Sequence, residues 1–205
     1  MELPHLKTLT QAGGKISETL QRHFADFCNK NKKRFFVMYG QTEATARMSY
    51  LPYQQALTKI GSIGIPIPDG NFSLINEQGE NIVKTNTVGE LVFEGSNVCM
   101  GYAQSIKDLS DNDINNGKLL TGDLAKKDDD GFYYIVGRKK RFLKIFGNRV
   151  NLDEVEGILK EIITDCACTG NDKKIIIYVK DHLNSAEIRK FISLKLGLHQ
   201  SIFTI

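Results

Sequence analysis

The stretch Phe36–Met48, FVMYGQTEATARM, joins an apolar run to a polar loop. The run Arg34–Tyr39, RFFVMY, is apolar almost throughout, which is typical of a strand covered on both faces. Gly40 ends this run, and Thr42 and Glu43 follow after Gln41. Ligands of open parallel sheets bind beyond the carboxyl ends of the strands. The stretch therefore predicts either a loop that meets a phosphate or Mg²⁺, or a turn in which Thr42 is a cap and Glu43 is solvated.

The residues before this stretch complete a strand–helix–strand unit. Residues 6–12 predict a short strand that ends at Gly13-Gly14. A helix is expected from about Lys15, because apolar residues then recur at helical spacing: Ile16, Leu20, Phe24 and Phe27. Two strands separated by a helix of this length predict a parallel pair with a crossover helix.

Short strands and turns dominate the segment from Gly61 to Gly137. Three strands are predicted, NFSLIN, GELVFEG and GFYYIVGR, each bounded by Gly, Asp or Asn. The run KKDDDGFYY predicts a hairpin with Asp130-Gly131 as its turn. We therefore expect antiparallel β structure here, in the form of a small distorted barrel.

The basic run GRKKR marks the expected domain boundary, between a first domain of residues 1–137 and a second of 138–205. The first domain divides into a βαβ piece (1–50) and a β-rich part (60–137). In the second, RFLKIFG and KIIIYVK predict strands, while LDEVEGILKEI and SAEIRKFISLKLG predict helices. Asn151 or Asp153 is the expected cap of the first helix, and Ser185 the expected start of the second. The fold class is thus α/β, of mixed α+β type, with a two-layer second domain.

Composition excludes several classes of protein. With 41% hydrophobic and 25% charged residues the 205-residue chain is globular, and its net charge of +3 is spread too evenly to predict a nucleic-acid surface. No apolar run is long enough to span a bilayer and no signal-peptide pattern opens the chain, so a cytoplasmic location is expected. The spacing of the four cysteines fits neither a zinc site nor a redox pair, and we expect reduced thiols.

Two further motifs contain polar residues suited to a nucleotide. Asp123 of TGD can accept hydrogen bonds from both hydroxyls of a ribose, and Arg138 of GR can bind hydroxyl or phosphate oxygens. The alternative is an ordinary turn at TGD and an unremarkable GR. In KIFGNRVNLDEVEGIL, Gly147 offers positive φ and acidic residues fill the first helical turn. That segment is equally consistent with a strand, a turn and a capped helix.

Taken in order, these motifs resemble those of the adenylate-forming ligases, which include acyl-CoA synthetases, luciferases and the adenylation domains of peptide synthetases. The family patterns YGxTE, GEl…G..v..GY, TGD and GR…k..G.rv…evE are similar to YGQTE, GELVFEGSNVCMGY, TGDL and GRKKRFLKIFGNRVNLDEVE. The resemblance covers nearly the whole chain. It implies the C-terminal part of the large domain of such a ligase, followed by its small domain.

The resemblance also implies a role for individual residues. Thr42 would contact the α-phosphate of ATP or AMP, and Glu43 would hold Mg²⁺. Asp123 would bind the ribose hydroxyls, with Arg138 completing the contact. The remaining implied residues are Ala12, Gly13 and Gly14 beside the adenine, Tyr39 stacked on it with Gly40 in the same segment, Lys140 as the hinge, and Gly147 and Arg149 for thioester formation.

The implied reaction begins when a small carboxylic acid attacks the α-phosphorus of ATP, which gives an acyl-adenylate and pyrophosphate. A thiol, from CoA or from the pantetheine of a carrier protein, then displaces AMP. The acyl pocket would be lined in part by residues after the YGQTE motif. Met48 and Tyr50 are the apolar candidates there, and both are equally suited to a plain core position.

Two segments that family members carry are absent from these 205 residues: a serine- and glycine-rich phosphate loop, and a P….GK segment with a lysine. We therefore expect a partial ligase, inactive as an isolated chain, either a fragment or one half of a split enzyme whose partner polypeptide carries the phosphate loop. The alternative is a non-catalytic remnant that binds a nucleotide or a partner protein.

Overall fold

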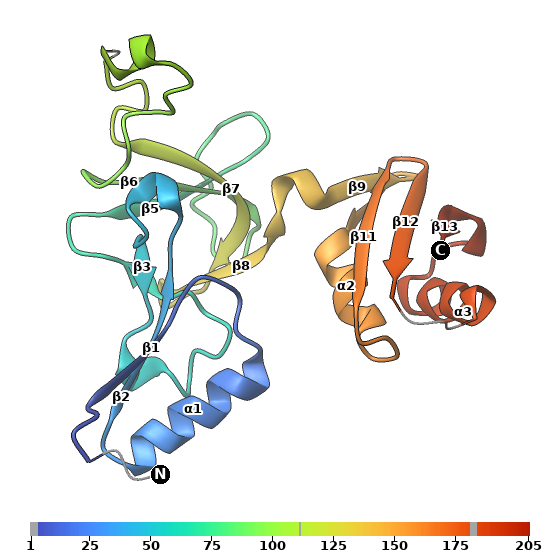
Figure 1. The fold of residues 1–205 in the computed structure, drawn as a ribbon, viewed down its shortest axis with the longest axis horizontal. Helices are drawn as coiled ribbons and strands as arrows, with labels where there is room; N and C mark the ends of the chain where they lie inside the picture. Colours follow the sequence, from blue (N-terminus) through green and yellow to red (C-terminus); the bar gives the residue numbers. More distant parts are fainter. Residues whose placement is uncertain (1–3, 111, 181–183) are drawn as a thin grey trace. The chain divides into compact units, whose positions relative to one another are not determined.

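The structure is a computed structural model, and it describes residues 4–110, 112–180 and 184–205. The chain divides into two compact units, Met1–Val136 and Gly137–Ile205, and each unit is described by itself. Figure 1 shows the order of their helices and strands.

The first unit begins with the expected parallel pair. Strand β1 (Thr8–Gln11) pairs in parallel with β2 (Arg34–Tyr39), and helix α1 (Glu18–Lys30) connects them (Figure 1). The helix begins three residues later than expected, because the Ser17 side chain accepts a hydrogen bond from the Leu20 N–H at 3.3 Å and so caps it. The prediction of a crossover helix is confirmed.

Helix α1 is attached to the rest of the unit by a buried amide. Gln21 is fully buried, donates to the carbonyl of Ala56 at 3.4 Å and accepts from the N–H of Gly61 at 2.9 Å. Its neighbours on the same face of the helix, Ala25 and Cys28, join a hydrophobic cluster that also contains Phe35, Val37, Leu51 and Ala56. The buried amide has both its donor and its acceptor satisfied, as burial of a polar group requires.

Two sheets make up the first unit. The first has the order β1-β2-β3-β4, in which β3 (Ser49–Tyr50) and β4 (Ile65–Pro66) are antiparallel additions. The second has the order β5-β6-β7-β8, with bounds Asn71–Ile75, Gly89–Glu94, Lys118–Lys127 and Tyr133–Arg138. The expected antiparallel β structure is thus present.

Short 3-10 helices occur in both units. They are Thr42–Ala44 (η1), Tyr53–Gln55 (η2), Ile106–Ser110 (η3), Lys139–Arg141 (η4) and Gln200–Ile202 (η5).

The segment Ser62–Gly64 connects the two sheets. The N–H of Tyr133 donates to the carbonyl of Gly64 at 3.0 Å, and the Ser62 hydroxyl donates to the carbonyl of Tyr133 at 2.8 Å. Gly64 has φ +85°, and a Cβ on it would lie only 1.9 Å from the carbonyl oxygen of Tyr50. Only glycine fits this close approach of two backbone segments.

The TGD motif lies inside a strand, and its interpretation as a turn is wrong. Thr121, Gly122 and Asp123 all belong to β7, where the pairing with β6 shifts register between Glu90 and Val92. Gly122 has φ +69°, which is the conformation of a bulge residue. The long-range pairing with β6 overrides a local sequence that favours a turn.

The expected hairpin turn at Asp130-Gly131 is present. A partly buried cluster of charged side chains attaches this hairpin to the rest of the unit. Lys59 donates to Asp128 at 2.9 Å and also to Asp130, and its ammonium lies 5.0 Å from the centre of the Phe132 ring. Burial alone acts to raise the pKa of Asp128, but hydrogen bonds from Lys59 and from the Phe132 N–H outweigh it, so the net pKa falls below 3.8. The pKa of Lys59 rises, because its hydrogen bonds to Asp130 and Asp128 favour the charged form.

Replacing Lys59 by methionine is therefore expected to lower the thermal midpoint of unfolding, most strongly near neutral pH. The stabilisation from Asp128 is present above its unfolded pKa and is lost as the pH falls through its lower folded pKa. The difference between wild type and Lys59→Met should therefore shrink below about pH 4, measured by circular dichroism melts. Lys118→Met is the matched control, because its pair with Glu94 is exposed and should contribute little. A difference that does not change with pH would contradict the assignment.

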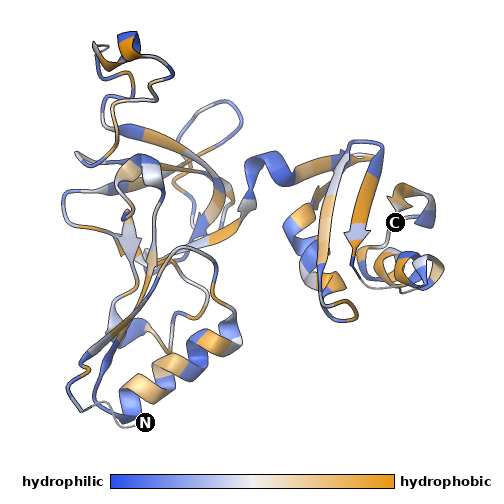
Figure 2. Ribbon diagram, in the orientation of Figure 1, coloured by the Kyte–Doolittle hydropathy of each residue, from blue (hydrophilic) through white to orange (hydrophobic). Residues whose placement is uncertain are grey.

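The second unit is a small α/β domain whose helices and sheet share one core. Strands β9 (Phe142–Ile145) and β10 (Asn148–Asn151) form a hairpin, and β11 (Cys166–Asn171), β12 (Lys174–Val179) and β13 (Phe203–Thr204) form a sheet. Helices α2 (Leu152–Leu159) and α3 (Ser185–Leu196) were predicted, and Figure 2 shows the hydrophobic residues along β12. The core includes Ile145, Val155, Leu159, Ile175, Ile177, Ile188 and Ile192.

Side-chain caps fix where both helices of this unit begin. The Asn151 side chain accepts from the N–H of Asp153 at 2.9 Å and caps α2, so Asn151 is the cap and Asp153 is not. The Asn184 side chain accepts from the N–H of Ala186 at 2.9 Å and caps α3 one residue before Ser185. Each cap satisfies a helix N–H that has no partner inside the helix.

Candidate functional site

The loop after β2 is a tight reversal that requires a glycine at its start. The carbonyl of Gln41 accepts from the N–H groups of Ala44 and Ala46, both at 3.0 Å, and Thr45 and Ala46 have φ of 49° and 69°. A Cβ on Gly40 would lie 2.4 Å from the carbonyl oxygen of Ala46. The glycine of YGQTE is therefore dictated by the fold of the loop itself.

Thr42 and Glu43 lie in η1 at the turn of this loop. Thr42 is exposed and Glu43 is half-buried. Gln41 is the residue before this short helix, and no side chain caps it, so the interpretation of Thr42 as a cap is wrong. Met48, which follows the loop, is fully buried in the core, whereas Tyr50 is half-buried with its ring 6.4 Å from that of Phe36.

Asp123 is brought to the start of the same loop. Only 2% of this residue is exposed, and its Oδ2 accepts from the Tyr39 hydroxyl at 2.5 Å and from the Gln41 amide at 3.0 Å. The Gln41 amide also donates to the carbonyl of Thr121 at 2.9 Å. The end of β2 and the bulge of β7 are thus linked through one carboxylate and one amide, although the bonded residues are 80 to 84 positions apart in sequence.

A second segment, residues 97–102, supports the loop from another direction. The Asn97 amide donates to the carbonyls of Ala44 and Arg47 at 2.7 and 2.9 Å, and the Cys99 N–H donates to the carbonyl of Glu43 at 2.7 Å. The Tyr102 hydroxyl donates to the Glu43 carboxylate. The backbone and the side chain of Glu43 are therefore both held by this segment.

The expected adenine-contacting residues follow β1. Ala12, Gly13 and Gly14 are exposed, and Gly13 has φ +87°. A Cβ on either glycine would meet no atom within 4 Å, so the space beside this backbone is open. An open backbone surface of this kind allows a flat ring to approach closely.

The other predicted site residues lie in the second unit. Arg138 and Lys140 are exposed, and Gly147 has φ +84° in the two-residue turn between β9 and β10. Phe146, the other turn residue, has φ 47° and is 79% exposed. Positive φ at both positions is typical of a type I′ turn. Arg149 lies in β10, and its side chain is outside the described part of the chain.

Arg141, which the sequence did not single out, is fixed within the second unit. Its guanidinium donates to Asp153 and to Glu156, both at 2.5 Å, and Glu156 also accepts from the N–H of Cys168 at 2.7 Å. These contacts attach η4 to the first turn of α2 and to β11. Asp153 and Glu156 of the DEVE motif thus have a structural role in this unit.

The four cysteines are free thiols, as predicted. Burial raises the pKa of Cys28 and of Cys166, and it raises the pKa of Cys168 to about 12, with the nearby Glu156 carboxylate adding to the effect. These three sulfurs are therefore protonated at neutral pH and are poor nucleophiles.

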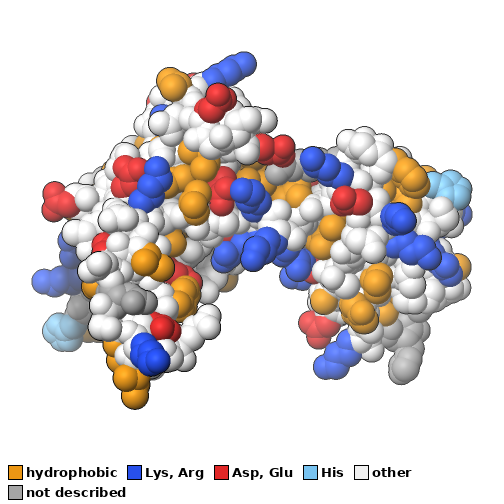
Figure 3. Space-filling view, turned by 90° about the horizontal axis from the view of Figure 1, so that it is seen from above, with side chains coloured by type: hydrophobic (Ala, Val, Ile, Leu, Met, Phe, Trp, Pro, Cys, Tyr) orange, Lys and Arg blue, Asp and Glu red, His pale blue; other side chains and the backbone are white. Residues whose placement is uncertain are grey.

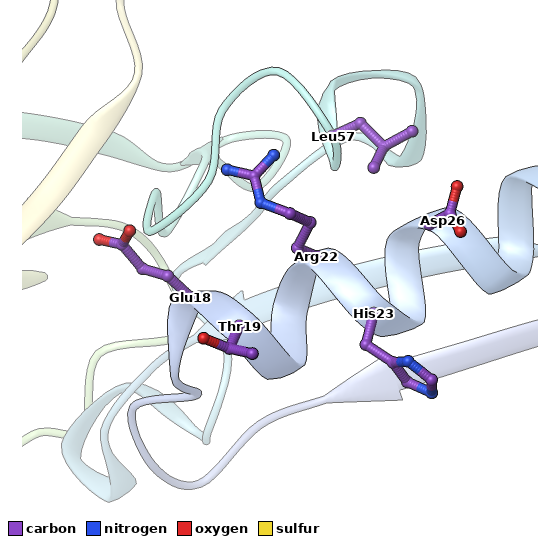
Figure 4. Close-up of a pocket in the computed structure, with 6 residues that line it drawn as sticks. All are labelled: Glu18, Thr19, Arg22, His23, Asp26 and Leu57. Atoms are coloured by element: carbon purple, nitrogen blue, oxygen red, sulfur yellow. The ribbon is translucent and has the colours of Figure 1, made fainter.

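A surface hollow of about 630 Å³ lies along α1, away from the loop after β2. It is lined by Glu18, Thr19, Arg22, His23, Asp26 and Leu57. In Figure 4 the Arg22 side chain points toward the segment that carries Leu57, whereas His23 points away from it. Because these side chains do not converge, the hollow does not form a binding site for one small group.

Charged side chains and possible metal ligands are spread over the described residues of both units. Figure 3 shows acidic and basic side chains interspersed with apolar ones on the visible face of each unit. Within residues 4–110, 112–180 and 184–205, no group of three or more His, Cys, Asp or Glu residues could hold a metal ion. Over the same residues, no helix has the length and apolar character needed to cross a membrane.

The chain matches a known family over its first half. The family described as "AMP-binding enzyme" matches residues 1–103, which include β1, the loop after β2 and the segment 97–102. The chain belongs to the AMP-binding enzyme family. Its motifs and its mixed α/β fold are those of adenylate-forming ligases.

Relatives within the AMP-binding enzyme family include CoA ligases. A long-chain-fatty-acid–CoA ligase of Escherichia coli O6:H1 is 37% identical over 123 residues, 60% of this chain and 21% of the relative. A probable 4-coumarate–CoA ligase 1 of Dictyostelium discoideum is 32% identical over 162 residues, 77% of this chain and 28% of the relative.

Among solved structures of such enzymes, the O-succinylbenzoate coenzyme A synthetase of Bacillus subtilis in complex with ATP and magnesium ion has a similar fold. The TM-score is 0.69 at 22% sequence identity, and the alignment covers 92% of this chain and 40% of that one. This AMP-binding enzyme chain thus spans 21–40% of the length of the three relatives.

Sequence reasoning missed three residues that hold the candidate site in place: Gln41, Asn97 and Tyr102. Gln41 occupies the variable position of YGxTE, and the other two lie within the quoted segment GELVFEGSNVCMGY. The contacts described for them above join residues 50 to 82 positions apart. A polar residue at each of these motif positions was the only available signal.

Proposed function

We propose that this chain carries the ribose and α-phosphate part of the nucleotide site of an ATP-dependent acid–thiol ligase. The observation that carries the proposal is the buried Asp123 carboxylate, which is held by Tyr39 and by Gln41, the residue before Thr42 and Glu43. Two protein donors occupy Oδ2 of Asp123 and fix the orientation of the carboxyl group. A carboxylate accepts at both oxygens, which suits the two hydroxyls of a ribose.

The residues present fit an adenylate in three respects. Thr42 is exposed and presents a hydroxyl suited to the α-phosphate, and the open backbone at Gly13-Gly14 suits the adenine. Glu43 is the single carboxylate at the turn, and Mg²⁺ is usually held by one or two carboxylates together with substrate phosphates and water. Tyr39 would contact the base through its ring while its hydroxyl remains on Asp123.

When bound, ATP would supply the activated phosphorus, and Mg²⁺ would neutralise part of the phosphate charge. The residues of this chain bind and orient: Asp123 holds the ribose, Thr42 holds a phosphate oxygen, and Arg138 completes the contact. In the second unit, Lys140 is the proposed pivot, and the turn at Gly147 with Arg149 would serve thioester formation. The substrate is a small carboxylic acid, and CoA is the favoured acceptor because the relatives are CoA ligases.

Calorimetry with AMP tests the proposal. Asp123→Asn keeps an acceptor oxygen for Tyr39 and Gln41 but removes the charge that strengthens hydrogen bonds to ribose, and it should weaken AMP binding about tenfold. Asp123→Ala should weaken it further, at some cost in stability. Asp26→Ala, which removes an exposed aspartate of α1, is the matched control and should leave AMP binding unchanged. Absence of AMP binding by the wild type would overturn the proposal and favour a partner-binding role.

The isolated 205-residue chain is expected not to release pyrophosphate from ATP when a carboxylic acid substrate is added. The missing serine- and glycine-rich loop would supply backbone donors to the β- and γ-phosphates, and the loss of such contacts costs orders of magnitude in rate. Incubation with ATP, Mg²⁺, a panel of carboxylic acids and hydroxylamine tests this. A polypeptide that carries the phosphate loop should restore release if the chain is half of a split ligase.

A further inference from the structure

We propose that Tyr102 is a positioning residue that orients the Glu43 carboxylate toward the cation of a bound nucleotide–metal complex. This inference rests on the proposed function. It is carried by the hydrogen bond from the Tyr102 hydroxyl to Oε1 of Glu43, between residues 59 positions apart. A hydrogen bond to one oxygen of a metal-binding carboxylate fixes its rotamer and presents the other oxygen.

The geometry of this contact is built from two sides. On one side, Glu43 lies in η1, and the backbone carbonyl of Glu43 accepts a hydrogen bond from the Cys99 N–H at 2.7 Å. On the other side, the Cys99 carbonyl accepts from the Asn115 amide at 2.7 Å, which ties residues 97–102 to the segment that precedes β7. The two partners are therefore held at a fixed separation by neighbouring backbone contacts.

Packing does not explain the position of the Tyr102 ring. The residue is 73% exposed, so little apolar area is removed from water. Tyr133 shows the contrast: it is 6% exposed, its ring packs 5.1 Å from that of Phe72, and its hydroxyl donates to the carbonyl of Phe72 at 3.0 Å. The Tyr102 side chain thus has its hydroxyl contact with Glu43 as its main interaction among those described.

The direction of this hydrogen bond follows from the two groups, because a phenol has one O–H donor and a carboxylate oxygen accepts. The Tyr102 hydroxyl is therefore the donor, and Oε1 of Glu43 is the acceptor. A carboxylate oxygen is also the kind of ligand that Mg²⁺ prefers.

The test compares Tyr102→Phe with the matched control Tyr178→Phe, which removes the hydroxyl of another exposed tyrosine in the second unit. ATP binding is measured by calorimetry over a Mg²⁺ titration, and AMP binding is measured without metal. Tyr102→Phe should weaken the apparent Mg²⁺ affinity about 10- to 100-fold. It should leave metal-free AMP binding and the thermal midpoint unchanged, and Tyr178→Phe should change neither.

A double-mutant cycle shows whether Tyr102 acts through Glu43. In a Glu43→Gln background, Tyr102→Phe should have no further effect on Mg²⁺ dependence. Equal Mg²⁺ affinities of wild type and Tyr102→Phe would overturn the inference while AMP binding by Asp123 still stands. Wild-type AMP binding without any Mg²⁺ dependence of ATP binding would also overturn it, because Glu43 would then hold no cation. Loss of AMP binding in the wild type itself would instead count against the proposed function.

Discussion

Replacing Gly64 by alanine is expected to destabilise the protein by more than about 3 kcal/mol. Two costs combine at this position. A non-glycine residue at φ +85° is strained, and the added Cβ would lie 1.9 Å from the carbonyl oxygen of Tyr50, which belongs to backbone and cannot turn aside. Relief of the clash would separate β3 from the Gly64–Tyr133 bridge that joins the two sheets. Denaturant unfolding followed by tyrosine fluorescence measures the change.

Gly79→Ala separates the two costs of the Gly64 substitution. Gly79 has nearly the same φ, +82°, but a Cβ there would meet no atom within 4 Å. It should therefore show only the conformational cost of about 1 kcal/mol. Equal destabilisation by the two substitutions would show that the close approach at Gly64 contributes nothing.

Gly40→Ala is expected to lower the affinity for AMP by a factor of about ten or more. Its Cβ would lie 2.4 Å from the carbonyl oxygen of Ala46, where ordinary contact begins at 3.4 Å. The loop must open by about 1 Å (3.4 less 2.4 Å), which moves Thr42 and Glu43 from the positions proposed to meet the phosphate and strains the Gln41 contact with Asp123. A charged hydrogen bond lost in this way is worth about 1.5–3 kcal/mol. Calorimetry with AMP measures the effect.

Gly157→Ala is the control for the Gly40 substitution. Gly157 lies inside α2, a Cβ there would meet no atom within 4 Å, and alanine favours a helix. The variant should be as stable as the wild type or slightly more stable, and it should bind AMP normally. Unchanged AMP affinity in Gly40→Ala would show that the loop does not contact the nucleotide.

Elements with strong local signals could be predicted from the sequence. The apolar run of β2, the amphipathic helix α1 and the hairpin at Asp130-Gly131 all formed where their patterns indicated. Strand β7 was not predicted, because Gly122 has positive φ and its local sequence resembles a turn, whereas pairing with β6 makes it a bulge. Strand β11, CACTGN, was missed because its composition is polar and contains a glycine that strand patterns disfavour.

Only those residues of the candidate site that lie in local sequence motifs could be proposed from the sequence. Thr42, Glu43 and Asp123 belong to short motifs whose polar residues are visible in sequence. The supporting contacts of Gln41 and Tyr102 depend on which segments the sheets bring together, and no local pattern specifies that. The chemistry of a motif is thus local, while the orientation of its side chains is set by residues far along the chain.

The protonated thiols described above have a consequence for a protein that handles activated acyl groups. An acyl-adenylate reacts with any available thiolate, so a protein sulfur with an ordinary pKa would compete with the acceptor thiol. Cys28 and Cys168 are 2% and 4% exposed, and burial keeps them and Cys166 in the unreactive thiol form. Under the proposed function, these three side chains are thereby protected from self-acylation, and the acyl group is left for the incoming acceptor.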